Sequence, residues 1–150
     1  MRGVEPVVER PRLRGWLHLA AFVASLGGLV WLVTSAATPR AEVVAWIYGS
    51  AAVAVYLTGT TYHVFARTER ARRLWQRADQ SMIFLLIAGT FTPVCVLAVH
   101  WRWRWGLLAL TWTVAAIGIV LKVFALERYR VLGHSLYFAL GIGAGITLLP

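Results

Sequence analysis

Charged residues are scarce in this sequence, and their scarcity excludes an ordinary soluble domain. They make up 14% of the 150 residues, apolar residues make up 59%, and the mean hydropathy is +0.68. Soluble domains carry about 25% charged and roughly 45–50% apolar residues. The charges are clustered, which leaves uncharged stretches of 25, 24, 22, 17 and 20 residues. Because about 20 helical residues cross the roughly 30 Å hydrocarbon layer of a bilayer, we predict an all-α fold, a polytopic bundle of transmembrane helices.

Cysteine is almost absent as well. The single cysteine, Cys95, lies inside an apolar stretch, which excludes an intramolecular disulfide and a cysteine-based metal site. The sequence also lacks a repeat of 20–50 residues and a linker that would divide the chain. We therefore expect one transmembrane domain over residues 1–150.

Five transmembrane helices account for the apolar stretches. They are expected at residues 16–36, 43–65, 80–99, 105–126 and 132–149. The first stretch is too long for the apolar region of a signal peptide, so we expect it to be retained, with Pro39 ending its helix. The basic segment 67–78 fits either a short amphipathic helix on the membrane surface, with Leu74 and Trp75 inserted, or a solvated loop.

Basic residues alternate between rich and poor connections. The segments before the first span, between the second and third, and between the fourth and fifth contain twelve: Arg2, Arg10, Arg12, Arg14, Arg67, Arg70, Arg72, Arg73, Arg77, Lys122, Arg128 and Arg130. The opposite side contains three: Arg40, Arg102 and Arg104. This bias predicts a multi-pass protein of the plasma (inner) membrane with a cytoplasmic N-terminus. It also makes membrane lipids, and not nucleic acid, the expected partners of the net charge of +9.

Four ionisable residues lie at the predicted cytoplasmic ends of the spans: His18, His63, Asp79 and His134. Ionisable groups at such positions are costly and are therefore functional candidates. Imidazole and carboxylate groups at one depth are suitable zinc ligands. The alternatives are that Asp79 is the N-cap of the third span and that His18 and His134 are interfacial polar residues.

His63 has the strongest local signal of the four. Tyr56, Thr60 and His63 follow one another at spacings of four and three, which places them on one face of a helix. Such a polar stripe indicates a face turned toward the interior of the bundle. In the third span, Pro93 removes a backbone hydrogen bond, and the threonine hydroxyls at residues 90 and 92 are expected to satisfy the freed carbonyls at a kink.

Three blocks of sequence resemble the hemolysin III family, which is related to the progestin and adipoQ receptors and more distantly to alkaline ceramidases. The blocks are residues 11–18 (PRLRGWLH), 61–63 (TYH) and 79–93 (DQSMIFLLIAGTFTP). The third is the most specific, and the resemblance extends over essentially the whole chain. It implies a seven-helix fold with a cytoplasmic N-terminus, so the five spans expected here would form a C-terminally incomplete domain.

The resemblance also implies a zinc site at the cytoplasmic side. His63 takes the place of one metal ligand, and Asp79 takes the place of the carboxylate that contacts a zinc-bound water. A carboxylate beside such a water can accept its proton, which is the chemistry of a metal-dependent amide or ester hydrolase. Some relatives act on lipid amides such as ceramide.

Two positions depart from the family pattern. The family commonly has a serine four residues before the histidine of the second span, where this sequence has Gly59, with Thr60 beside it. The family's last helix supplies a His-x-x-x-His pair, whereas His134 is followed four residues later by Phe138. A membrane-lytic, pore-forming or receptor-like protein, or an inactive remnant, is therefore the alternative to a zinc hydrolase. The pattern carries no signal for a particular oligomeric state.

Overall fold

The computed structural model describes residues 12–124, and within this range all regular structure is helical. The elements are α1 (Arg12–Thr34), α2 (Pro39–Thr60), the π-helix η1 (Thr61–Phe65), α3 (Glu69–Pro93), the π-helix η2 (Val94–Ala98) and α4 (Trp101–Phe124). Four continuous helical segments are long and apolar enough to cross a membrane: Gly15–Thr34, Pro39–Phe65, Glu69–Ala98 and Arg102–Phe124. These correspond to the first four predicted spans. The fifth, at 132–149, lies outside the described residues.

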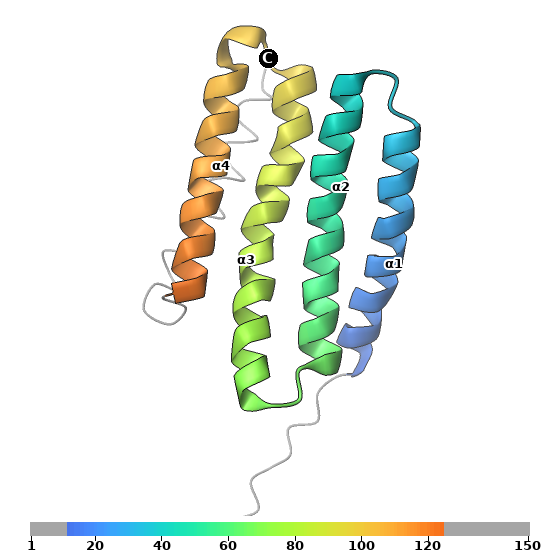
Figure 1. Cartoon of the computed structure of the whole chain (residues 1–150), viewed down its shortest axis with the longest axis vertical. Helices are drawn as coiled ribbons and strands as arrows, with labels where there is room; N and C mark the ends of the chain where they lie inside the picture. The colour runs from blue at the N-terminus through green and yellow to red at the C-terminus, as the bar shows by residue number, and fades with distance from the viewer. Residues whose placement is uncertain (1–11, 125–150) are drawn as a thin grey trace, which may run out of the picture.

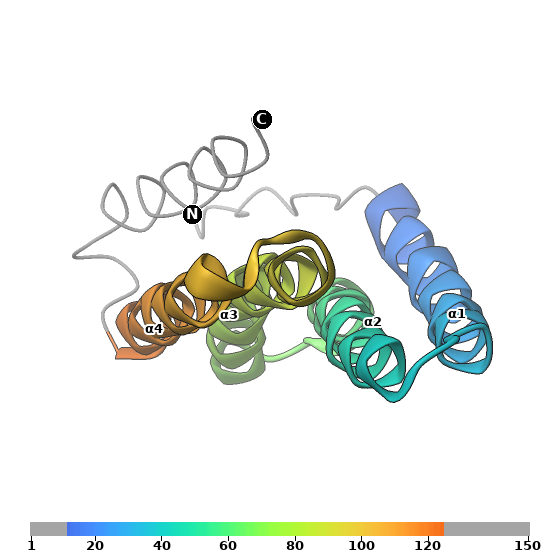
Figure 2. The ribbon, with the colours of Figure 1, turned by 90° about the horizontal axis from the view of Figure 1, so that it is seen from above.

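The four segments stand side by side in antiparallel order (Figure 1). Seen from above, they form a single curved row in the order of the sequence (Figure 2). Each described helix packs against its neighbours in the sequence, and α1 contacts only α2 and η1 among them. Helices α1 and α3 begin at the same end of the bundle, measured along the helix axes (Figure 1), and we call this the basic end. The start of α1 contributes Arg12 and Arg14 to this end, and the connection to α3 with its first turns contributes Arg67, Arg70, Arg72, Arg73 and Arg77.

The boundary between α1 and α2 differs from the prediction. Pro39 does not end the first helix, because α1 already stops at Thr34 and Pro39 is instead a first-turn residue of α2. Proline suits this position since its fixed φ is helical and its missing N–H would have no partner in the helix. The Thr38 side chain caps α2 by accepting a hydrogen bond from the Ala41 N–H at 3.2 Å.

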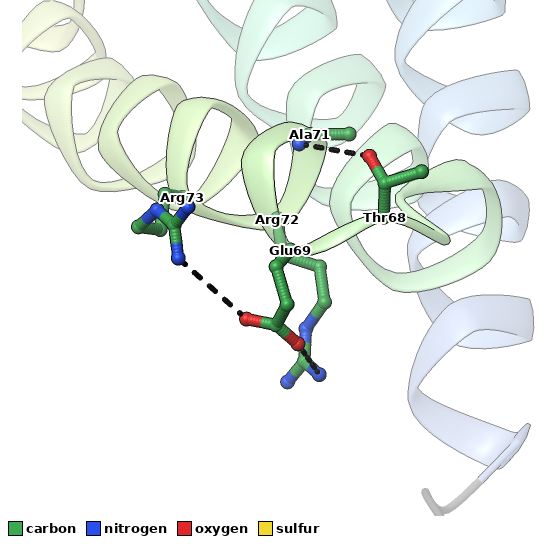
Figure 3. A network of polar contacts seen from close by, with 5 residues as sticks. All are labelled: Thr68, Glu69, Ala71, Arg72 and Arg73. Atoms are coloured by element: carbon green, nitrogen blue, oxygen red, sulfur yellow. Dashed lines mark hydrogen bonds and ion pairs between the residues drawn. The ribbon is translucent and has the colours of Figure 1, made fainter.

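Helix α3 begins much earlier than expected: residues 69–78 are helical, so the loop interpretation was wrong, but they are the first turns of α3 and not a separate short helix. Thr68 is the N-cap and accepts a hydrogen bond from the Ala71 N–H at 3.2 Å. Glu69 lies in the first turn, where a carboxylate favours the helix dipole, and it pairs with Arg72 at 3.2 Å and Arg73 at 3.8 Å (Figure 3). The basic segment is therefore the start of a helix that continues into the apolar stretch.

Small residues set the distances between the helices. Gly89 of α3 faces Ala51 of α2 so closely that a Cβ at residue 89 would lie 2.7 Å from the Ala51 Cβ. On the other side of α3, Phe84 is fully buried with Ala88 and Ala115. Without a hydrophobic driving force between helices in lipid, such close van der Waals packing holds the row together.

Two threonines of α3 form hydrogen bonds within their own helix or to α4. The Thr90 and Thr92 hydroxyls donate to the carbonyls of Leu86 and Ala88, whereas the carbonyl that Pro93 frees is that of Gly89, so the prediction was right about intrahelical bonding and wrong about its acceptor. Thr92 also accepts a hydrogen bond from the Trp112 indole of α4 at 3.1 Å. Beyond Pro93 the helix continues as η2, where the Val99 N–H donates to the Val94 carbonyl. The irregularity at Pro93 is thus followed by one wider helical turn.

The α2–α3 contact predicts a specific cost for Gly89→Ala. The added methyl group overpacks a contact between two backbones, which costs about 1–3 kcal/mol, and this outweighs a gain of roughly 1 kcal/mol in helix propensity. We expect a lower thermal unfolding temperature for the detergent-purified variant. Gly28→Ala is the matched control, because a Cβ at residue 28 meets nothing within 4 Å. Equal unfolding temperatures for the two variants would contradict this packing.

Candidate functional site

Three of the four ionisable candidates come together near the basic end. His18 lies on α1, His63 on η1 and Asp79 on α3, so three consecutive membrane-spanning segments each contribute one side chain. All three residues are half-buried. The fourth candidate, His134, lies outside the described residues. Asp79 is not the N-cap of α3, because the helix begins at Glu69 and Asp79 is an interior residue of it.

The contact centres on Gly59 of α2. A Cβ at residue 59 would overlap the His18 ring, with the ring Nε2 2.9 Å away, and would lie 3.2 Å from the Asp79 Oδ1. The imidazole of α1 and the carboxylate of α3 therefore face the same small space above the α2 backbone. Because residue 59 has no side chain, the His18 ring can lie directly on the α2 backbone there.

His63 completes the cluster. Its ring centre lies 5.0 Å from that of His18, with an angle of 51° between the ring planes. The edge of Tyr62 packs against the same ring at 4.8 Å between centres. The Asp79 carboxylate interacts through its charge with both His63 and His18. The arrangement is a pair of imidazoles beside one carboxylate.

Two local features bring His63 into this position. Residues 61–65 form a π-helical turn, in which the Ala66 N–H donates to the Thr61 carbonyl at 3.1 Å. This wider turn changes the direction in which His63 points, and such turns often occur at functional sites. Gly15 of α1 is buried against η1, where a Cβ would lie 3.0 Å from Val64 Cγ2 and 3.8 Å from His63 Cβ. The close approach of α1 to η1 thus depends on Gly15.

The predicted polar stripe on the second span is confirmed in its orientation. Thr60 is 4% exposed, and Tyr56 and His63 are half-buried. The Thr60 hydroxyl donates to the Tyr56 carbonyl at 2.7 Å, so its proton is engaged within α2. Gly59, and not Thr60, is the residue above which His18 and Asp79 meet.

Sequence reasoning missed the role of the two glycines at the site. In the sequence, Gly59 stands out only as a departure from the family pattern, and Gly15 only as part of the block at residues 11–18. A glycine next to a polar stripe in a membrane helix is a signal for close approach of a neighbouring helix. That signal could have indicated contact with α1, although it does not name His18 as the residue in contact.

The donor groups suit zinc in kind. Imidazole nitrogens and carboxylate oxygens are its ordinary ligands after thiolates, and a catalytic site usually has three protein ligands. Among the residues that the structure describes, no group of three His, Cys, Asp or Glu side chains is arranged to hold a metal ion. The described residues therefore fit part of a zinc site.

Comparison with known proteins identifies the family. A family model described as "Haemolysin-III related" matches residues 7–150. The chain belongs to this family. The resemblance inferred from the three sequence blocks is confirmed, and the chain is a membrane protein of the hemolysin III type. No solved structure matches it.

The chain is similar to proteins from bacteria and mammals. Hemolysin-3 of Bacillus cereus is 32% identical over 127 residues, covering 83% of this chain and 58% of the relative. The Hemolysin-3 homolog of Bacillus subtilis (strain 168) is 29% identical over 127 residues, covering 83% and 59%. Human monocyte to macrophage differentiation factor is 23% identical over 117 residues, covering 71% and 47%. The chain thus spans about three fifths or less of the length of these relatives.

The geometry at Gly59 predicts the effect of Gly59→Ala. The new methyl group would displace the His18 ring, which is the movable end of a side chain, so the fold should persist while the imidazole environment changes. In detergent-solubilised protein with ¹⁵N-labelled histidine, we expect the ring signals of His18 and His63 to shift and those of His100 to stay. Gly27→Ala, with nothing within 4 Å of its Cβ, should leave all of them in place. Unchanged His18 signals in Gly59→Ala would refute the contact.

Proposed function

We propose that this chain belongs to a zinc-dependent hydrolase of lipid amides or esters embedded in the plasma (inner) membrane. The observation that carries the proposal is the meeting of His18, His63 and Asp79 from three membrane-spanning segments above Gly59. Ionisable groups within membrane segments are expensive to place there and mark functional sites by default. The proposed activity and zinc ion are those of a protein with the length of the bacterial relatives, of which this chain covers 58% and 59%.

The roles within the site follow from the chemistry of each group. His63 would be one zinc ligand, and the remaining ligands would come from residues beyond 124 or from His18. When bound, zinc supplies a Lewis acid that activates water and polarises a carbonyl group. Asp79 carries the only carboxylate of the cluster, so it would accept the proton of the attacking water and return it to the leaving group.

The proposed orientation places the basic end at the cytoplasmic face, as part of a seven-helix domain. Support comes from the twelve basic residues of one set of connections against three of the other. The exposed arginines at the start of α3 would then lie among anionic lipid headgroups. A site just inside that surface would meet the bond between a lipid headgroup region and its acyl chain.

A membrane-lytic function is the second candidate. It is favoured by the names of the two bacterial relatives, Hemolysin-3 and Hemolysin-3 homolog. A protein that only permeabilises membranes would not need Asp79 for its activity. The two functions therefore separate in the behaviour of a single variant.

The zinc proposal predicts the metal content of the detergent-purified protein. We expect about one zinc ion per chain, as in catalytic zinc sites, with loss of that ion in His63→Ala. His100→Ala is the control, since His100 is exposed at the end of the bundle opposite the basic end. Zinc that persists in His63→Ala would remove His63 from the ligand set.

The proton-transfer role predicts that Asp79→Ala abolishes hydrolysis of a lipid-amide substrate. Loss of a general base typically lowers the rate by about 10²–10⁴-fold. The measurement is product release from ceramide in mixed micelles, beside dye leakage from liposomes with the same protein. Leakage that is equally strong with and without the Asp79 carboxylate, in the absence of any hydrolysis, would favour the lytic function. Glu69→Ala removes a carboxylate outside the cluster and should leave hydrolysis unchanged.

A further inference from the structure

Lys122 is a charged residue on the packing face of α4. It is 4% exposed and lies in the last turn of the helix, within the membrane-spanning segment Arg102–Phe124. Together with Thr111, Ala115 and Gly118 it forms a buried stripe, in which successive members are four, three and four residues apart. An ammonium group at such a position is costly and marks a functional site by default.

The register of α3 against α4 shows what Lys122 lies beside. The two helices are antiparallel (Figure 1), and a Cβ at Gly118 would overlap the Phe84 ring of α3. The indole–threonine hydrogen bond between the two helices fits the same register. One turn beyond Gly118, Lys122 therefore lies level with Ser81, which is 2% exposed and precedes Phe84 by nearly one turn.

Exposed arginines continue the same face of α3 toward the membrane surface. Arg77 precedes Ser81 by four residues and Phe84 by seven, so it shares their face of the helix. Arg73 and Arg70 precede Arg77 by four and seven residues, and all three arginines are exposed. Three guanidinium groups and one buried ammonium group thus follow the contact between α3 and α4. We call these four residues the cationic seam: Arg70, Arg73, Arg77 and Lys122.

The cationic seam lies on the other side of α3 from the cluster formed by Asp79 and the two histidines. Asp79 and Ser81 are two residues apart, which turns their side chains about 160° from each other around the helix. Asp79 accordingly faces Gly59 of α2, whereas Ser81 lies on the side of Phe84 and α4. The role of the seam is therefore independent of the proposed hydrolase chemistry.

A phosphate group suits this arrangement of cations. A guanidinium group can bind phosphate through two parallel N–H bonds, and an ammonium group adds a compact point charge. Arg73 is paired with Glu69 at 3.8 Å (Figure 3), and an exposed pair of this length is weak, so it competes little with a phosphate. An ammonium group has three N–H donors, so Lys122 can bind a phosphate oxygen alongside a contact within the protein.

The depth of the seam favours a lipid over a free anion. Eleven residues of continuous helix separate Arg70 from Ser81, which is a rise of roughly 16 Å at 1.5 Å per residue. A soluble anion would have to enter the membrane to reach Lys122, whereas the phosphate of a lipid is held at the interface by its own acyl chains. Basic pockets between transmembrane helices near the cytoplasmic surface bind anionic lipid headgroups.

We propose that the cationic seam binds the headgroup of an anionic phospholipid. Its phosphate lies between Arg77 and Lys122, and Arg70 and Arg73 attract the headgroup from the membrane surface. The acyl chains remain in the bilayer beside α3 and α4. The lipid is thus bound at a defined place between two helices, and not only by the overall charge of the basic end.

Native mass spectrometry of the detergent-purified chain counts bound lipids directly. Titration with dioleoyl phosphatidylglycerol should show a single tightly bound lipid. Dioleoyl phosphatidylcholine, whose headgroup has no net charge, should bind at least about tenfold more weakly, and equal binding of the two lipids would overturn the proposal. We expect Lys122→Met and Arg77→Gln each to weaken phosphatidylglycerol binding by roughly tenfold, because each removes a charge-assisted hydrogen bond to the phosphate.

Arg67→Gln is the matched control. It removes an equal charge from the same end of the bundle, but Arg67 is an exposed residue that precedes α3 and lies outside the seam. This variant should keep the affinity of the unaltered chain. Equal weakening in Arg67→Gln and Arg77→Gln would overturn the proposal, because binding would then follow only the charge of the surface.

Inorganic phosphate distinguishes a lipid site from a site for a free anion. Added at the same concentration as phosphatidylglycerol, it should leave the lipid bound, and displacement of the lipid would overturn the assignment to a phospholipid. Elution as a single species in size-exclusion chromatography shows that each variant is folded. Arg77 is exposed, so Arg77→Gln tests the seam even if the buried change Lys122→Met prevents folding.

Discussion

Close approach of neighbouring helices at glycine is the interaction on which the described structure depends. In lipid, apolar side chains gain little by leaving their surroundings, so helices associate through contacts that only small residues permit. Gly89 brings α3 against α2, and Gly15 and Gly59 bring α1 against the end of the second span. The first contact shapes the row of helices, whereas the other two determine which side chains meet at its basic end.

The transmembrane segments could be predicted from the sequence because they follow from a general constraint. Backbone groups in a bilayer must be satisfied internally, so long uncharged stretches become helices. The ends were harder to predict. Thr38 and Thr68 cap the second and third helices, and α3 extends well into the basic segment, because a capped helix with i,i+4 charge pairs does not need to stop where the apolar stretch stops.

The sequence predicts how deep the site residues lie along their helices, but not the direction in which their side chains point. Charge clustering placed His18, His63 and Asp79 at one depth, and the structure brings the three together, although Asp79 lies inside α3 and not at its start. Whether they face one another depends on how each helix is rotated about its axis, and a π-helical turn and two glycine contacts determine that rotation. The glycine contacts act between segments distant in sequence, so the local pattern that marked His63 contained no equivalent signal for His18.

The arrangement of the helices in a curved row also affects how the protein unfolds locally. With contacts only between successive members among the described helices, its stability is close to a sum of pairwise interfaces, as in repeat proteins. An outermost member of such an array can detach locally while the others stay associated. Within the described row α1 is such a member, so its detachment would carry one imidazole away from the other and from the carboxylate. Assembly of the cluster is therefore thermodynamically linked to the docking of the first helix.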